Sequence, residues 1–193
     1  MRVPRAGLNR GLVVEHALAV VDEGGPRGFE TLSLSAVAAR TGVAVPSLYK
    51  HVGSLEDLKT AVATVAVREL AAALAGATIG LAKEDALRAL AGAYREFARR
   101  APGRYAATQR AAGAGQEDLA QAAAETVAVT VSVLRGFGLP PERSIDAVRV
   151  VRSALHGFVV LESGGGFGLP NDLDQSFGVL VDTLVSGIRS LAP

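Results

Sequence analysis

The 193-residue sequence contains no cysteine and no tryptophan, and only 5% of its residues are aromatic. The absence of cysteine excludes disulfide bonds and thiolate chemistry. A core poor in aromatic residues is built mainly from Ala, Val and Leu, which favours packed helices over strands. Neither an internal repeat nor the apolar–polar alternation of strands is found in the sequence. We therefore expect an all-α protein with about nine helices.

The sequence also has little net charge and no segment suited to a membrane. Its 20 basic and 19 acidic residues nearly cancel, so bulk electrostatics do not indicate a nucleic-acid partner. Only Arg2, Arg5 and Arg10 concentrate positive charge, near the N-terminus, where they are as well explained by a solvated tail as by phosphate contacts. The N-terminus does not resemble a signal peptide, and the apolar run 120–134 is too short and polar to span a bilayer. We expect a cytoplasmic protein without a membrane partner.

The most informative stretch is Leu34–Val52, in which two short helical patterns meet at Gly42. A serine at 33 or 35 is available to cap the first helix, and Gly42 supplies the left-handed step of a tight turn. The second pattern begins near Val45, with Pro46 in its first turn. It directs five residues outward: Pro46, Ser47, Tyr49, Lys50 and His51. A helix this short is not stable alone, and helix-turn-helix DNA binding explains why its exposed side chains are polar.

From about Asn9 to Glu69 the sequence resembles the DNA-binding domain of TetR/AcrR-family transcriptional regulators. The resemblance rests on Gly42-Val43, on the run PSLYKHV at 46–52, and on Ser54 with Leu58, close to the family pattern GV…TLYxHF…K..L. It implies a three-helix DNA-binding domain at residues 9–69 and a six-helix ligand-binding and dimerisation domain at 70–193. It implies neither a cofactor nor a metal.

The resemblance also implies which residues touch DNA. Ser47, Tyr49 and His51 are expected to donate hydrogen bonds to phosphates, and Lys50 to contact a phosphate or a base edge. Val45 and Pro46 are placed to meet a thymine methyl. The remaining positions, where family members place backbone contacts, are Leu34 and Ser35. One departure is Leu55, which stands where the family often has a phosphate-binding lysine, and we expect weaker DNA binding from it.

The rest of the chain reads as a series of helices separated by breaks rich in glycine and proline. Breaks are expected at 24–26, 102–103 and 163–170. The expected helices are Asn9–Glu23, Leu58–Leu74, Glu84–Arg100, Arg104–Ala112, Leu119–Phe137, Pro141–Glu162 and Asp172–Leu191.

The C-terminal part resembles one class of TetR-family C-terminal domains more weakly. Leu155-His156-Gly157 is similar to the Trp-His-Gly signature of that class, and the run 102–105 fits it too. A small-molecule site needs a mostly apolar cavity with a few polar groups, and we expect it to take a small apolar effector. The candidate pocket residues, each equally explained as core, are Tyr94, Phe97, Tyr105, Gln109, Val131 and His156.

The last two helices carry broad apolar stripes, which suggests a homodimer. Two such helices from each of two chains can form a four-helix bundle across a two-fold axis, and a dimer explains how two DNA half-sites are bound. Ordinary core packing stays an open alternative. The candidate interface residues are Leu155, Val159, Phe177, Leu180, Leu184 and Ile188.

We therefore interpret the sequence as a ligand-responsive transcriptional regulator, a repressor. It is expected to bind a palindromic double-stranded operator as a homodimer and to be released by its effector. An enzyme is disfavoured, because His16, His51 and His156 are far apart and GxSxG and HExxH motifs are absent. The alternative is a helical protein-interaction module without specific DNA binding, which Leu55 and the weak basic balance leave open.

Overall fold

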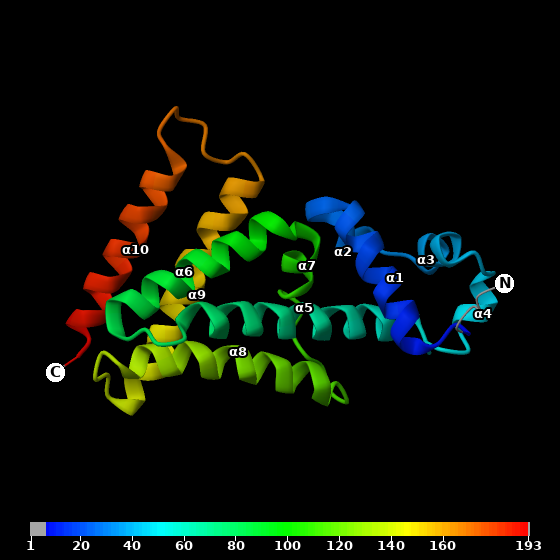
Figure 1. Cartoon of the computed structure of the whole chain (residues 1–193), viewed down its shortest axis with the longest axis horizontal. Helices are drawn as coiled ribbons and strands as arrows, with labels where there is room; N and C mark the ends of the chain where they lie inside the picture. Colours follow the sequence, from blue (N-terminus) through cyan, green and yellow to red (C-terminus); the bar gives the residue numbers. More distant parts are fainter. Residues whose placement is uncertain (1–6, 193) are drawn as a thin grey trace. The chain divides into compact units, whose positions relative to one another are not determined.

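The computed structural model describes residues 7–192, and within that range it contains helices and no strand (Figure 1). The all-α prediction is confirmed, with ten α-helices and one 3₁₀-helix in the described range. Arg2 and Arg5 lie outside the described residues. The elements are α1 (Arg10–Glu23), η1 (Gly25–Arg27), α2 (Gly28–Thr31), α3 (Leu34–Thr41), α4 (Val45–Leu48), α5 (Leu55–Thr78), α6 (Lys83–Arg100), α7 (Pro102–Ala107), α8 (Glu117–Arg135), α9 (Pro141–Ser163) and α10 (Leu173–Ser190).

These elements form two compact units. Unit 1 comprises the described residues up to Ala66 together with Ala101–Leu119, and unit 2 comprises Val67–Arg100 and the described residues from Ala120 onward. Helix α5 therefore contributes its first half to unit 1 and its second half to unit 2. The functional boundary at residues 69 and 70 stays a prediction, whereas the structural division also assigns α7 to unit 1.

The core of unit 1 forms because α1, α3 and the start of α5 turn their apolar stripes toward one another. The side chain of Asn9 caps α1 by accepting the N–H of Leu12 at 3.0 Å. Fully buried residues of this core are Val13, Ala17, Val21, Val37, Leu48, Leu58, Val62, Ala66 and Ala107. Ala107 belongs to α7, so residues that follow α6 in the chain complete the core around the N-terminal helices.

A close backbone approach packs α7 and α2 against α1. A Cβ added at Gly28 would lie 1.9 Å from the carbonyl oxygen of Val21, and one at Gly103 would lie 2.3 Å from the same atom. Only glycine fits at both positions. The guanidinium of Arg104 holds the carboxylate of Asp22 beside this contact at 2.7 Å.

Two of the expected breaks differ in the structure. The chain does leave α1 after Glu23, but it continues at once into η1 and α2 instead of forming a loop. Pro102 does not interrupt the chain either, because it occupies the first turn of α7, where its missing N–H costs nothing. The short helix expected at 104–112 therefore begins two residues earlier and ends at Ala107.

In unit 2, α6, α9 and α10 pack against one another (Figure 1). They meet around Arg95, whose guanidinium lies 4.7 Å from the ring centre of Phe177 and 5.4 Å from that of Phe158. Arg95 donates to both oxygens of Glu162 at 2.6 and 2.9 Å and to Asp174 at 2.8 Å. One arginine of α6 thus fixes the end of α9 to the start of α10.

Within the described residues, α5 alone is long and apolar enough to cross a membrane by length and composition. Its most apolar window has a mean hydropathy of 1.4, and 44% of that window is buried inside the chain. Core helices of globular proteins pass the same test, and α5 supplies Leu58, Val62 and Ala66 to the core of unit 1. The first half of α5 is therefore part of the core of unit 1.

Candidate nucleic-acid interface and effector region

The helix-turn-helix begins with a capped helix and a glycine turn, as the sequence predicts. The hydroxyl of Ser33 accepts the N–H of Ala36 at 3.2 Å and thereby caps α3. Gly42 ends α3 with φ of +69° and ψ of +25°, in the left-handed region that favours glycine. The N–H of Val43 then bonds back to the carbonyl of Ala38 at 3.2 Å. These local bonds fix the angle at which the chain enters α4.

The segment after the turn presents polar side chains around two buried anchors. Leu48 and Val52 are buried in the core of unit 1, which holds α4 and the turn at 49–51 in place. Tyr49 is 53% exposed and Lys50 is also exposed. The other predicted contact residues of the segment divide into exposed Pro46 and partly buried Val45, Ser47 and His51.

Two of the predicted contact positions, and Leu55 after them in the chain, carry apolar side chains that pack inward. Leu34 is buried in the core of unit 1, and Val45 and Leu55 are partly buried against it. Leu34 can therefore offer only its backbone N–H, at the start of α3, and Ser35 beside it is exposed. Leu55 packs against the core of unit 1 and so places no charge on this part of the surface.

The start of α5 is fixed to the N-terminus of α1 by an ion pair. The guanidinium of Arg10 contacts the two oxygens of Asp57 at 2.6 and 2.7 Å and reaches the carbonyl of His51 at 3.2 Å. Asp57 also accepts the N–H of Gly53, and its own N–H is accepted by Ser54, which caps α5 as predicted. The bond from Arg10 lowers the pKa of Asp57 to about 2, helped by the N–H of Gly53. Arg10 therefore holds the segment at 49–53 in position.

Lys50 is the cation of this surface that is least engaged by the rest of the chain. The structure records neither an ion pair nor a hydrogen bond for its ammonium among residues 7–192. The other nearby cations are engaged, since Arg40 pairs with Glu23 and Lys59 donates to the carbonyl of Glu30 at 3.3 Å. An exposed cation beside the exposed Tyr49 and the partly buried His51 suits contact with phosphates.

The residues predicted to line an effector pocket fall in both units. Tyr105 and Gln109 belong to unit 1, whereas Tyr94, Phe97, Val131 and His156 belong to unit 2. Tyr94, Phe97 and Tyr105 are buried, and Gln109, Val131 and His156 are partly buried. Burial, followed by the positive charge of Arg152, lowers the pKa of His156, which favours the neutral imidazole.

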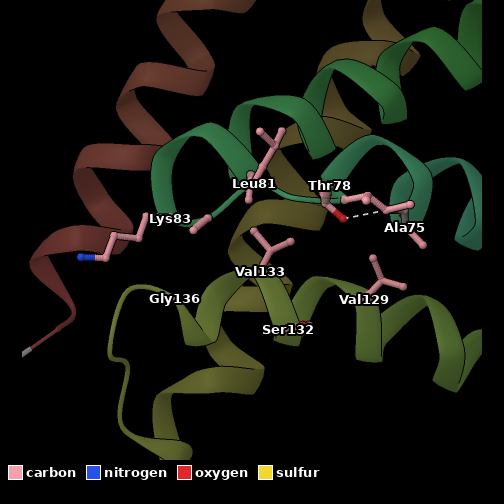
Figure 2. Close-up of a pocket in the computed structure, with 11 residues that line it drawn as sticks. Ala75, Thr78, Leu81, Lys83, Val129, Ser132, Val133 and Gly136 are labelled. Carbon is pink, nitrogen blue, oxygen red and sulfur yellow. Dashed lines mark hydrogen bonds between the residues drawn. The ribbon is translucent and has the colours of Figure 1, made fainter.

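A cavity of about 280 Å³ in unit 2 is lined by none of these six residues. It lies where the last turn of α5 and the connection to α6 face the second half of α8 (Figure 2). Val129 and Val133 point from α8 toward α5, while the ammonium of Lys83 points away from the other labelled side chains (Figure 2). This cavity is not predictable from the sequence, because its lining residues form no motif.

The residues predicted to form a dimer interface mostly face the core of unit 2. Leu155, Val159, Phe177, Leu184 and Ile188 are buried within the single chain, and Leu180 is partly buried. Within the single chain these side chains pack as core residues, which is the alternative that the sequence analysis left open. Different apolar residues of α9 and α10 are exposed: Val150, Val160, Leu161 and Val179.

Comparison with known proteins adds a family match and full-length relatives. Residues 87–184 match the model of the tetracyclin repressor-like C-terminal domain. The HTH-type transcriptional regulator Rv0681 of Mycobacterium tuberculosis is 37% identical over 95% of this chain and 83% of its own length. The regulator YobS of Bacillus subtilis is 29% identical over 96% of this chain and 95% of its own length.

Solved structures share the fold. The regulatory protein SCO4313 aligns with a TM-score of 0.73 at 27% identity, over 92% of this chain and 95% of its own. The Q116A variant of TetR from Acinetobacter baumannii AYE was solved in complex with minocycline. It aligns with a TM-score of 0.71 at 21% identity, over 96% of this chain and 99% of its own.

Proposed function

The chain belongs to the TetR family of transcriptional regulators, and from this premise we propose that it is a ligand-responsive repressor. In this proposal a homodimer binds a palindromic operator in the cytoplasm, and a small apolar effector in the C-terminal domain releases it. The chain acts by binding and carries out no enzymatic reaction.

The observation that carries the proposal is the exposed polar segment after Gly42. Tyr49 and Lys50 stand out from a segment whose position is fixed by two buried anchors, Leu48 and Val52. A helix presented in this way enters the major groove while its flanks hold phosphates. Ser47 and His51 add donors on the same segment, and the first N–H groups of α3 add backbone contacts.

Homodimer formation is supported by the outer faces of the last two helices. Val179 on α10 is 61% exposed and Val150 on α9 is 51% exposed, although both are large apolar residues. Gly178 and Gly187 are exposed on α10, and small residues let two helices approach closely. A second copy of this surface would cover these valines across a two-fold axis. In this proposal the interface uses the outer faces of the helices named in the sequence analysis.

Release by an effector requires that unit 2 and unit 1 be linked. The chain supplies three links: α5 runs through both units, α6 of unit 2 leads directly into α7 of unit 1, and α8 begins in unit 1 and continues into unit 2. Since α7 packs on α1 with a glycine at the contact, a shift of α6 reaches the DNA-binding unit without passing through flexible side chains. An effector acts by favouring the state in which the two DNA-binding units no longer match the half-sites. Minocycline binding by a TetR of the same fold supports a small-molecule ligand.

The test is a selection of random duplex DNA by the purified chain, followed by sequencing. We expect enrichment of a two-fold-symmetric motif whose half-sites lie about 34–36 Å apart or a multiple of that spacing. The affinity for that motif should then be measured against salt concentration. Lys50→Ala should reduce the slope by about one unit, and Tyr49→Ala with Lys50→Ala should abolish specific binding.

Lys83→Ala is the matched control, because it removes the same charge from unit 2 and should leave the affinity and the slope unchanged. Dimerisation should be intact in both variants. A double variant that still binds the selected motif normally would overturn the assignment of the DNA-binding segment. A selection without any enrichment at moderate salt would favour a protein-interaction module.

A further inference from the structure

We propose that Arg10 and Asp57 are positioning residues that determine how strongly the chain discriminates its operator from other DNA. This inference rests on the DNA binding proposed above and extends it to residues outside α3 and α4. The two side chains come from α1 and α5, which precede and follow the helix-turn-helix in the sequence. They act through the backbone of residues 51–53 and set the orientation of the side chains that face DNA.

The DNA-facing segment has few restraints of its own. Helix α4 comprises only the four residues Val45–Leu48, and its N-cap residue is Ala44, which has no side chain that can cap it. The N–H groups of His51 and Val52 both return to the carbonyl of Leu48, at 2.8 and 3.0 Å. A single turn of this kind is not stable alone. The backbone that follows therefore needs support from other elements.

The ion pair supplies this support at two peptide groups. One nitrogen of Arg10 donates to the carbonyl of His51 at 3.2 Å and to Asp57 at 2.7 Å, and the other donates to Asp57 at 2.6 Å. The carboxylate oxygen at 2.7 Å also accepts the N–H of Gly53 at 2.9 Å. The pair thus bonds to the peptide groups on both sides of Val52. A bidentate pair has a fixed geometry, so it fixes both groups together.

Both members of the pair are themselves held in place. Arg10 is the first residue of α1, which packs through Val13 and other buried residues into the core of unit 1. The N–H of Asp57 is accepted by the hydroxyl of Ser54 at 3.0 Å, and Leu58 beside it is fully buried. The position of two core helices is therefore passed to the backbone at 51–53.

Charge balance distinguishes this role from a phosphate contact. The hydrogen bond from Arg10 lowers the pKa of Asp57 to about 2, so the carboxylate is ionised at neutral pH and balances the guanidinium. A pair without net charge contributes little to the counterion release on which non-specific binding depends, whereas the exposed ammonium of Lys50 contributes fully. Removing the pair should therefore leave the salt dependence of binding unchanged.

The expected loss is a loss of specificity. Phosphate contacts carry no sequence information, whereas base contacts require side chains to meet base edges in a defined geometry. Lys50 and His51 lie on the backbone that the pair supports. When the peptide groups around Val52 lose their fixed orientation, these side chains can still reach phosphates but no longer meet the bases of the operator in one geometry.

The test removes the pair without changing the net charge of the chain. Arg10→Gln with Asp57→Asn deletes one positive and one negative charge. The matched control is Arg110→Gln with Glu56→Gln, which deletes a second pair at the same first turn of α5. Within the described residues, the bonds recorded for the side chains of Arg110 and Glu56 do not involve 49–53.

Affinities of the full chain are measured by fluorescence anisotropy for the selected operator and for random duplex DNA of equal length, over a range of salt concentrations. We expect the Arg10/Asp57 variant to lose at least tenfold in the ratio of operator to random affinity, with a salt slope within half a unit of the unmodified chain. The control should keep the ratio within twofold. A merely structural role would reduce binding to both DNAs alike and leave the ratio unchanged.

A second measurement needs no DNA. Hydrogen exchange followed by NMR should show the amide of Gly53 exchanging at least fivefold faster in the Arg10/Asp57 variant and at an unchanged rate in the control. Should the double variant fail to fold, Arg10→Lys keeps the charge but lacks the planar fork that reaches both Asp57 and the carbonyl of His51. It should still lower the ratio at least threefold.

The outcomes that contradict the proposal are distinct from one another. An unchanged ratio, an equal loss in the control, or an unchanged exchange rate at Gly53 would each overturn it and leave the proposed function standing. Equal losses on both DNAs with a salt slope lower by about one unit would show that Arg10 binds a phosphate directly, which also overturns it. An unmodified chain that selects no operator would overturn the proposed function, and this inference with it.

Discussion

The two units use arginine–carboxylate pairs in different surroundings. In unit 1 the Arg10–Asp57 pair joins α1 to α5, with side chains that are 50% and 35% exposed. In unit 2 the Arg95–Glu162 pair joins α6 to α9, with side chains that are only 9% and 14% exposed, beneath Phe158 and Phe177. Exposed pairs contribute about 0–1 kcal/mol, whereas breaking a buried pair leaves an uncompensated charge and costs about 3–5 kcal/mol.

This difference shows how each unit is stabilised. Unit 1 depends on its apolar core, and its surface pairs adjust the position of the DNA-facing segment. The junction of α6, α9 and α10 in unit 2 depends in addition on the buried pair of Arg95 and Glu162. Three predictions follow the comparison from its largest expected effect to its smallest.

The buried network should dominate the stability of unit 2. Arg95→Met removes the guanidinium and leaves the carboxylate of Glu162 buried without its partner, so we expect a loss of about 3–5 kcal/mol in the free energy of unfolding. Urea titrations followed by circular dichroism measure this loss. Arg88→Met is the matched control on the same helix, because it breaks an exposed pair with Asp182 and should cost less than about 1 kcal/mol. Similar losses in both variants would contradict the contrast between buried and exposed pairs.

The inner and outer faces of α10 should respond differently to substitution. Leu184 is buried and Val179 is exposed, although both are apolar residues of one helix. Leu184→Ala should cost about 2–5 kcal/mol of stability through the cavity it creates. Val179→Asp should unfold like the unmodified chain but sediment as a monomer at concentrations where the unmodified chain is a dimer. A dimer that tolerates Val179→Asp would remove the outer face of α10 from the proposed interface.

The exposed pair of unit 1 should give a small effect that depends on pH. Because Arg10 lowers the pKa of Asp57 from 3.8 to about 2, the stabilisation is fully present above pH 3.8 and is lost as the pH falls through 2. Asp57→Asn should therefore cost less than about 1 kcal/mol at pH 7, and its difference from the unmodified chain should shrink toward pH 2. Asp146→Asn, at an exposed pair with Arg149, should have no measurable effect at any pH. A constant difference across the range would show that Arg10 does not act through the charge of Asp57.

The elements predictable from the sequence were those defined by local signals. Ser33, Gly42 and Ser54 act within three or four residues of their own positions, so the caps and the turn of the DNA-binding segment follow from the sequence directly. The periodicity of α10 correctly grouped Phe177 with Leu184 on one face. It did not specify whether that face meets the chain's own core or a second copy, because periodicity identifies a shared face and not its neighbour.

Contacts between distant segments gave no such signal. The assignment of α7 to unit 1 depends on Gly103 meeting Val21 across more than 80 positions, and a glycine before Arg104 reads locally as a break. Likewise, Arg95 is one of many arginines in the sequence, and only the fold places Glu162 and Asp174 around it. The cavity beside α5 is lined by residues from α5, the turn at 79–82, α6 and α8, and no local pattern of the sequence brings these segments together. Each of these features depends on which distant segments meet in the fold, and the local sequence does not specify that.

The glycine contact between α7 and α1 has a consequence for protein engineering. A designer who joins the DNA-binding part of this chain to a different sensor would naturally cut once, within α5. That single cut would discard residues 101–119, which belong to unit 1, and would leave Ala107's place in the core empty. A functional chimera that keeps both segments of unit 1 needs three junctions: in α5 after Ala66, before Ala101, and in α8 after Leu119. Gly103 then stays against the carbonyl of Val21. The DNA-binding unit of this chain therefore consists of two separate segments and not of one contiguous domain.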